Sequence, residues 1–240
     1  MKDFKKYSEE NIHFYDTNIP SLVEKIIPVK RFNFLDLGCG DGRLLYALFN
    51  RGLLENANKV VGVDLAQERC KAVKKISNKI QTICSDACHV KQLNENSFDI
   101  IISNQVIEHI QDDNLLLKEI RRILKKGGKA YVSTVLKKWY GWYFYKNDGK
   151  AVLDPTHVRE YKSSDELKNL FESNGLEVIT IRVKQIYFPV IDLFIRGLIT
   201  LSILKKNREI YVKNSFLRSL HNTIRFPIIG YKNIEVLATK

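Results

Sequence analysis

The stretch FLDLGCGDGR, residues 34–43, carries the strongest local signal, because an apolar strand runs directly into a glycine-rich turn and then into a helix. Glycine lets the backbone turn sharply and lets a ligand approach the main chain, and the first turn of a helix offers unpaired N–H groups. The stretch therefore predicts a binding site for a polar molecule. The spacing is Gly38-x-Gly40-x-Gly42, with Arg43 where the dinucleotide fingerprint has its third glycine, so NAD is disfavoured.

The rest of the chain alternates short apolar runs with segments of helical period, which is typical of an α/β fold with a doubly wound, mostly parallel sheet of seven strands. We expect strands at residues 33–37, 59–64, 80–84, 98–103, 128–135, 176–184 and 233–239, and helices at residues 43–50, 67–76, 114–124 and 164–173. A segment of helical period, residues 187–231, separates the last two strands. We predict a single domain over residues 1–240, with residues 187–231 as a helical insertion.

Two further acidic positions follow strand ends. Asp64 ends the second strand, and Asp86 with Ala87 follows the third. In parallel sheets ligands bind at the carboxyl edge, where a carboxylate can accept from the two hydroxyls of a ribose. Asp86 and Ala87 would suit the amine and edge of an adenine. A glycine turn alone can be only a tight connection, and these two acids are what favours a nucleoside.

At these residues the sequence resembles the class I S-adenosylmethionine-dependent methyltransferases, especially the broad group that includes ubiquinone- and menaquinone-biosynthesis and glycan-pathway enzymes. Four segments carry the resemblance, which covers roughly residues 33–183: LDLGCGDG, VVGVDLAQE, SDA, and FDIIISNQVIEHI followed by LLLKEIRRILKKGGKAYVST. The resemblance implies a Rossmann-like methyltransferase fold, S-adenosylmethionine as the cofactor, and methyl transfer as the reaction.

The resemblance also implies which residues bind the cofactor. It puts Asp36 near the methionine ammonium, Gly38 and Gly40 against the cofactor, Asp64 on the ribose with Leu65 beside it, Asp86 and Ala87 at the adenine, and Asn104 and Gln105 facing the methionine and the transferred methyl group. This layout suits a ligand that carries a sulfonium, an ammonium and a carboxylate but no phosphates.

Methyl transfer to a hydroxyl needs a base beside the cofactor. The favoured base is His157, in the stretch LDPTHVREY at residues 153–161, which resembles a DPTHxREY-type segment of related methyltransferases. Asp154 or Glu160 could orient its ring, and a purely structural role for His157 stays open. Glu108 and His109, after the fourth strand, are further catalytic candidates, although the helix dipole alone favours an acid at a helix start.

The excess of Lys and Arg over Asp and Glu is 39 − 27 = +12, which favours anionic partners. A nucleic-acid methyltransferase is therefore the alternative function. The Asn-Pro-Pro-Tyr type motif of base-modifying enzymes is absent after the fourth strand, where residues 103–106 read SNQV. We expect a small or lipid- or glycan-linked acceptor, methylated at oxygen.

The cysteines and the N-terminus bear on metals and on location. Cys39, Cys84 and Cys88 with His89 form an incomplete ligand set, and no Cys-x-x-Cys pair occurs, so we predict neither a metal nor disulfides. The first residues lack the apolar run of a secretory signal, and residues 188–204 are too short and too charged to span a membrane. The protein is expected in the cytoplasm.

Two segments could contact the acceptor or a bilayer. Residues 139–145, WYGWYFY, could line an acceptor pocket, stack on rings, lie at a membrane interface, or pack on themselves. The insertion has a net charge of 7 − 2 = +5, and an apolar helix is expected from near Pro189, with Asp192, Arg196 and Thr200 as a polar stripe. Either the insertion is a lid that contacts a membrane or lipid-linked substrate through residues 188–225, or it only caps the core.

Overall fold

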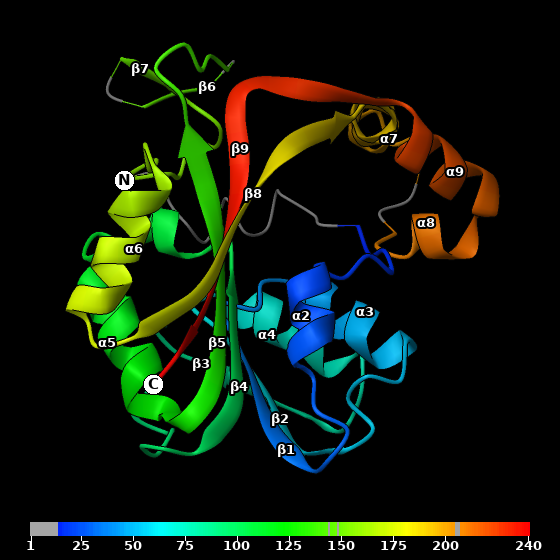
Figure 1. Cartoon of the computed structure of the whole chain (residues 1–240). Helices are drawn as coiled ribbons and strands as arrows, with labels where there is room; N and C mark the ends of the chain where they lie inside the picture. The colour runs from blue at the N-terminus through cyan, green and yellow to red at the C-terminus, as the bar shows by residue number, and fades with distance from the viewer. Residues whose placement is uncertain (1–13, 144, 148, 205–206) are drawn as a thin grey trace.

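The computed structural model describes residues 14–143, 145–147, 149–204 and 207–240, without the side chains at positions 146, 147, 150, 196 and 200. Figure 1 shows a central sheet with helices on both faces and an arm that leaves the sheet at one end. The sheet strands are β1 (Phe32–Leu37), β2 (Ala57–Asp64), β3 (Ile80–Cys84), β4 (Phe98–Asn104), β5 (Leu124–Lys137), β8 (Glu177–Pro189) and β9 (Arg225–Thr239).

The strand order is β3-β2-β1-β4-β5-β9-β8. Strands β1 to β5 are parallel to one another, and β9 runs antiparallel between β5 and β8. This confirms the predicted seven-stranded, mostly parallel, Rossmann-like sheet. Because β1 lies between β2 and β4, the carboxyl ends of β3, β2, β1 and β4 form one continuous edge.

Each face of the sheet packs against its own helices (Figure 1). On one face lie α2 (Ser21–Ile26), α3 (Arg43–Asn50) and α4 (Gln67–Lys74), and on the other α5 (Asp113–Ile123) and α6 (Ser164–Ser173). Phe34, Leu45 and Val73 belong to the core cluster of the first layer, whereas Leu117 and Phe171 belong to that of the second. Side chains alternate across a strand, so one sheet supplies both cores.

The predicted helices agree with the observed ones at residues 43–50 and 164–173 and differ by one or two residues at the other two. Helix α6 begins where its cap dictates, because Ser163 Oγ accepts from the backbone of Glu166 at 3.1 Å while Glu166 Oε2 accepts from the backbone of Lys162 at 2.8 Å. Helix α2 and the hairpin β6 (Tyr145–Asn147) and β7 (Lys150–Val152) were not predicted.

The largest difference from the sequence prediction concerns the last two strands. Strands β8 and β9 continue as a paired, two-stranded arm beyond the sheet, with Phe188 opposite Phe226 and Tyr187 opposite Pro227. Pro189 and Pro227 argue against central strands, so the sequence did not predict this extension. Both strands of a two-stranded arm are edge strands, and edge strands tolerate proline. The helical part of the insertion is therefore shorter than predicted, from Val190 to Thr223.

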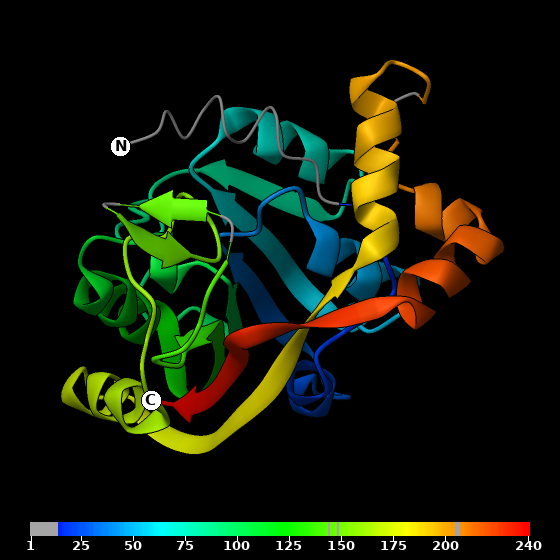
Figure 2. The same cartoon turned by 90° about the horizontal axis from the view of Figure 1, so that it is seen from above.

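The arm carries α7 (Val190–Thr200), α8 (Ile210–Lys213) and α9 (Ser215–Thr223) (Figures 1 and 2). Helix α7 begins directly after Pro189, as predicted. Asp192 turns inward, where its Oδ1 accepts from Tyr211 Oη at 2.5 Å and lies 2.9 Å from His221 Nδ1. The predicted polar stripe is thus used for internal contacts at this residue, while the side chains of Arg196 and Thr200 lie outside the description.

Within the described part of the chain, no helix is both long enough and apolar enough to cross a membrane.

Candidate functional site

The glycine turn lies between β1 and α3 and combines a packed glycine with an open one. Gly38 has φ +84°, and a Cβ there would lie 2.4 Å from a Val106 methyl carbon. Gly40 has φ +54°, and apart from its chain neighbours no described residue has an atom within 4 Å of the position that its Cβ would take. Both conformations favour glycine. Gly38 is needed for packing, whereas Gly40 exposes backbone to open space in which a ligand can approach.

Asp36 is buried at the end of β1. Burial raises its pKa to about 7, and the neighbouring Asp64 carboxyl adds to the rise. A carboxyl that is held partly protonated beside another carboxyl gains stability from a cation. The position therefore suits the ammonium group that the sequence analysis assigned to Asp36.

Asp64 ties the end of β2 to the glycine turn. Its Oδ2 accepts from the backbone of Gly40 at 2.9 Å, its Oδ1 accepts from the backbone of Ala66 at 2.9 Å, and Arg69 lies 3.8 Å away. Burial raises the pKa of Asp64, and the two backbone N–H groups and Arg69 oppose that rise. The residue thus shapes the backbone that would receive a nucleoside, in addition to offering carboxylate oxygens.

The remaining predicted cofactor residues follow the ends of β2, β3 and β4. Leu65 is 58% exposed, which leaves an apolar surface beside Asp64, and Ala87 is buried next to Asp86, whose Oδ1 accepts from the backbone of Cys88 at 2.8 Å. At the end of β4, Asn104 Oδ1 accepts from Ser133 Oγ at 2.5 Å. Gln105 adopts φ +57°.

The Gln105 amide contacts Ser133 and Asn233 and, with its nitrogen turned toward Glu108 Oε1, donates to that carboxyl at 3.1 Å. The predicted cofactor residues therefore lie on four neighbouring strand ends. We call these four strand ends, where the methyl donor is expected, the donor edge. Gln105 joins the donor edge to the second half of the site.

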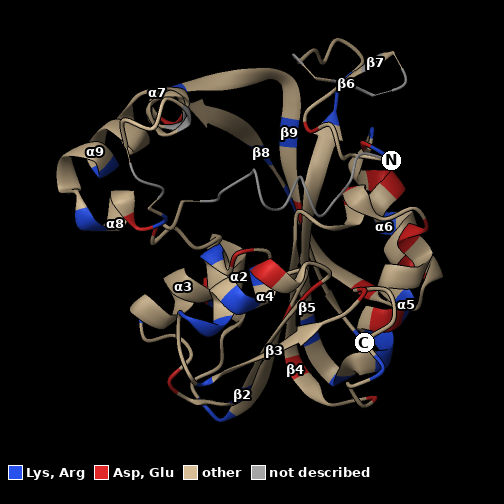
Figure 3. Ribbon diagram, turned by 180° about the vertical axis from the view of Figure 1, so that it is seen from behind, with Lys and Arg blue, Asp and Glu red and all other residues tan. Residues whose placement is uncertain are grey.

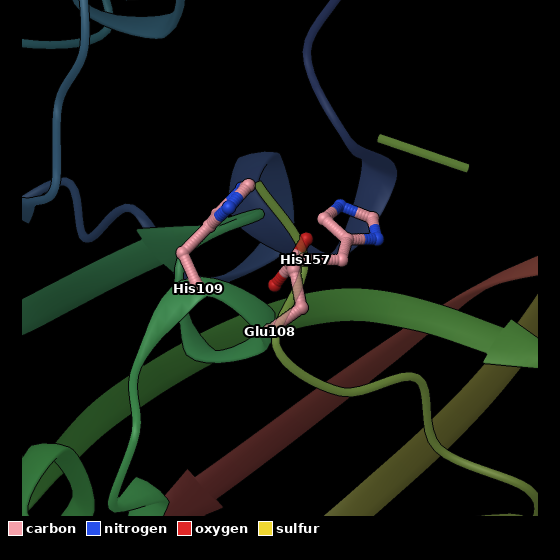
Figure 4. Close-up of side chains that lie close together, drawn as sticks. All are labelled: Glu108, His109 and His157. Carbon is pink, nitrogen blue, oxygen red and sulfur yellow. The ribbon is translucent and has the colours of Figure 1, made fainter. Parts of the chain in front are cut away.

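The second half is a cluster of Glu108, His109 and His157 (Figure 4). Glu108 and His109 belong to the short helix η1 (Ile107–His109) after β4, and His157 comes from the loop after β7. The two imidazole rings meet edge to face, with centroids 4.9 Å apart. The chain joins η1 to this loop through the Glu108 carbonyl, which accepts from the backbone of Val158 at 3.0 Å.

Both rings are held by neighbours. His157 Nδ1 lies 3.3 Å from Glu160 Oε1, so Glu160 is the residue that orients His157. Asp154, the other candidate for this task, accepts from Thr156 Oγ1 at 2.6 Å. Thr156 Oγ1 in turn lies 3.0 Å from His109 Nδ1. The polar loop predicted to present His157 therefore fixes both histidines.

Burial sets the protonation of the cluster. It raises the pKa of Glu108 to about 7, although the nearby His157 and the hydroxyl of Thr134, which donates to Glu108 Oε2 at 2.9 Å, both oppose the rise. Burial and the charge of His157 lower the pKa of His109 to about 4. At neutral pH His109 is uncharged, while Glu108 is close to the midpoint of its titration. Perturbed values of this kind are typical of sites that move protons.

The cluster could also hold a cation, because one ligand atom from each of its three residues lies within 4.8 Å of the others. Among the residues that the structure describes, this is the group with metal-ligand geometry, rather than the cysteine and His89 set weighed in the sequence analysis. Neutral imidazole and carboxylate are common ligands of divalent transition metals.

One contact of the glycine turn had no sequence signal. Arg208, in the segment between α7 and α8, pairs with Asp41 at 3.3 Å, and its carbonyl accepts from the backbone of Tyr15 at 2.7 Å. Tyr15 Oη donates to the Asp41 carbonyl at 2.9 Å. The arm and the segment before α2 therefore meet at the turn, and the Arg208–Asp41 pair alone joins residues 167 positions apart.

Comparisons with known proteins agree with this geometry. A family described as a methyltransferase domain matches residues 35–132. The ubiquinone biosynthesis O-methyltransferase of Bartonella quintana is 32% identical over 178 residues, which are 70% of this chain and 68% of that protein. The human mitochondrial enzyme of the same name is 29% identical over 175 residues, and there the match spans 46% of the relative.

Solved structures share the fold at lower identity. The YcgJ protein from Bacillus subtilis has a TM-score of 0.63 at 19% identity, over 91% of this chain and 96% of that one. A phosphoethanolamine N-methyltransferase from Haemonchus contortus, solved with S-adenosylhomocysteine, has a TM-score of 0.60 at 19% identity, over 92% of this chain and 51% of that one. At 19% identity these structures show a shared fold. The chain belongs to the class I S-adenosylmethionine-dependent methyltransferases, and S-adenosylmethionine is its methyl donor.

Proposed function

We propose that this methyltransferase acts on a hydroxyl oxygen of a small molecule, either free or linked to a lipid or glycan. The observation that carries the proposal is the buried His157, which lies between Glu108 and Glu160 at the edge of the sheet that also holds the donor turn. An oxygen acceptor loses a proton on methylation, so it needs a base in this place. The names of the ubiquinone O-methyltransferase relatives support the same acceptor atom. A nucleic-acid acceptor has only the net charge of +12 in its favour.

On the donor side, S-adenosylmethionine supplies an electrophilic methyl group on a positively charged sulfur. We infer that the Asp36 carboxylate pairs with its ammonium group and that Asp64 accepts from the ribose hydroxyls, with Leu65 against the sugar. Asp86 and Ala87 would take the adenine. Gly38 and Gly40 would bring the backbone against the ligand, and Asn104 and Gln105 would hold the methionine end.

On the acceptor side, His157 removes the proton of the attacking hydroxyl. Bound S-adenosylmethionine would supply the methyl group to this oxygen and would keep the carbon–sulfur bonding pair on its sulfur. Glu160 at Nδ1 fixes the ring, so Nε2 takes the proton. Glu108, buried near the imidazole, stabilises the positive charge that His157 gains. His109 packs against the ring and holds Thr156 rather than transferring the proton.

We also infer that residues 187–231 act as a lid within a single domain of residues 1–240. Support comes from the contact of Arg208 with Asp41, because Asp41 belongs to the turn that receives the donor. A segment that holds this turn can exclude water from the reacting groups, which strengthens electrostatic interactions there.

The test is His157→Ala, assayed by transfer of labelled methyl from S-adenosylmethionine to phenols with apolar tails of increasing length. Turnover should fall about 10²-fold, as expected for loss of a general base, while donor affinity by calorimetry stays the same. His109→Ala should reduce turnover less. An unchanged rate in His157→Ala, with chemistry rate-limiting, would contradict the proposal. Activity lost with EDTA and restored by a divalent metal would instead assign the cluster to a cation.

A further inference from the structure

Helix α7 has apolar side chains on two opposite sides, and among the described residues one side packs in a core while the other is largely exposed. Ile191, Ile195 and Ile199 follow one another at four-residue spacing and pack in a small core with Phe14 and Tyr211. That contact fixes how the helix sits on the arm. The other side of the helix is largely exposed.

The other side of α7 is apolar as well. Val190, Leu193, Phe194, Gly197 and Leu201 recur at intervals of three and four residues, so they share one face of the helix. Leu193 is 62% exposed, Phe194 63% and Leu201 70%. A helix that is apolar all round is normally buried all round. The exposed face therefore has an energetic reason to meet an apolar phase.

Further large apolar side chains are exposed at the same end of the molecule. Phe226 and Ile229 lie on the curved first part of β9, and Trp139 and Trp142 lie in the loop after β5; Ile229 is 71% exposed and Trp139 is 94% exposed. Figure 1 shows the curve of β9, α7 and the β6–β7 hairpin at one end of the molecule, and Figure 2 views that end directly. We call this set the apical face: Leu193, Phe194, Leu201, Phe226, Ile229 and Trp139.

The charge around the apical face is positive. Residues 187–231 hold seven Lys and Arg and only Asp192 and Glu209 as acids. Both acids are engaged within the lid, Asp192 with Tyr211 and His221 and Glu209 with Lys213. Basic residues lie on α8 and on α9, which contacts α7, and Arg218 of α9 is exposed (Figure 3). A second copy of the chain would bring two such positive surfaces together, so a negatively charged partner fits better.

From these observations we infer that the apical face docks on the surface of an anionic lipid bilayer, with α7 lying in the plane of the interface. Apolar side chains on one face of a helix with basic residues beside them are the features of helices that bind there, and tryptophan is enriched at that depth. The face lies at the carboxyl end of the parallel strands, so docking turns the site toward the lipids. This inference rests on the proposed function in one respect, because turning the site toward the lipids is useful only for a lipid-linked acceptor. Its test requires no methyl transfer.

The test measures sedimentation of the full chain with vesicles of phosphatidylcholine and phosphatidylglycerol, against vesicles of phosphatidylcholine alone. We expect preferential binding to the anionic vesicles, which weakens as salt is added. Leu193→Ser with Phe194→Ser should weaken binding about 10²-fold or more, the loss of burying two apolar side chains. Arg218→Gln should weaken it up to about fivefold. The matched control is Leu115→Ser on α5, which removes an exposed leucine outside the apical face and should leave binding unchanged.

Tryptophan fluorescence gives a second, independent readout, because Trp139 belongs to the apical face and Trp142, the other tryptophan of the chain, lies in the same loop. Their emission should shift to the blue on anionic vesicles and be quenched by brominated lipid. Equal binding to both kinds of vesicle, or a loss in the Leu115 variant as large as in the α7 double variant, would overturn the inference. A second outcome would also overturn the inference: the wild-type chain forms a concentration-dependent dimer, the α7 double variant does not, and neither protein binds vesicles. Calorimetry of donor binding to the same variants tests the methyltransferase assignment separately.

Discussion

The donor edge and the proposed lid, residues 187–231, differ in how their contacts are made. At the donor edge the important groups lie within a few residues of a strand end, and Asp64 reaches Gly40 across two neighbouring strands. In the lid, the contacts join distant parts of the chain, as when Arg208 reaches Asp41. The donor edge is thus a product of strand order, whereas the lid depends on how an extended arm folds back. Substitutions in the first region should have large and local effects, and those in the second smaller and transmitted ones.

The largest effect is expected from Asp64→Ala. The substitution removes the acceptor for the ribose and also frees the Gly40 backbone, so donor affinity should fall about 10³-fold, which corresponds to two charge-assisted hydrogen bonds. Titration calorimetry with S-adenosylmethionine measures this loss. Asp64→Asn keeps one oxygen acceptor and should lose less. Normal donor binding by the alanine variant would contradict the assigned ribose contact.

The next effect concerns the two glutamates beside His157, whose pKa values are shifted in opposite directions. Burial raises the pKa of Glu108 from 4.5 to about 7. Glu108 therefore loses its proton at lower pH in the unfolded chain than in the folded protein, and the free energy of unfolding falls as pH rises from 4.5 to about 7. Glu108→Gln should remove this loss, which is worth up to about 3 kcal/mol above pH 7.

Glu160 should behave in the opposite sense. Burial of Glu160 is outweighed by the hydrogen bonds from His157 and the Leu153 backbone and by Lys137, which lower its pKa. Its contribution to stability is present above its unfolded pKa and is lost as pH falls through the lower folded value. Urea unfolding of both Gln variants across pH measures the two slopes. Parallel slopes in the two variants would rule out this division of roles.

A tenfold effect is expected at Asp36. Because its pKa is about 7, ionisation of Asp36 should accompany donor binding, and donor affinity should rise as pH increases through that value. Asp36→Asn should bind about tenfold more weakly above pH 7, one pKa unit's worth of interaction, and should lose the pH dependence. Calorimetry in buffers of different ionisation enthalpy reports the proton released. If the donor affinity of the wild-type protein does not depend on pH, Asp36 does not pair with the ammonium group of the donor.

The smallest effect is expected from Arg208→Gln, which breaks the pair between the lid and the glycine turn. The arginine is partly exposed, so donor affinity should fall only about threefold. Lys213→Gln is the matched control, since it removes an ion pair within the lid that does not reach the turn. Equal losses in the two variants would show that the contact with Asp41 does not matter to the donor.

The candidate site also has one part that follows from local sequence and one that depends on distant contacts. Glycine spacing and acids after apolar runs predicted the donor edge, because a parallel sheet brings its strand ends together. The proximity of Glu108, His109 and His157 was not visible in the sequence, since it depends on a loop that returns 47 residues later to bond η1 through Thr156. The roles of Asp154 and Glu160 were interchangeable in sequence and are separated only by geometry.

Local patterns were sufficient for the α/β class, for the seven sheet strands and for the ends of helices such as α6, because hydrophobic period and capping act between neighbours in the chain. The tertiary structure alone decided how far β8 and β9 extend, which side of α7 is packed, and how strongly Asp36 and Glu108 hold their protons. Strand pairing, burial and desolvation depend on residues far away in sequence, and no short stretch of sequence encodes them.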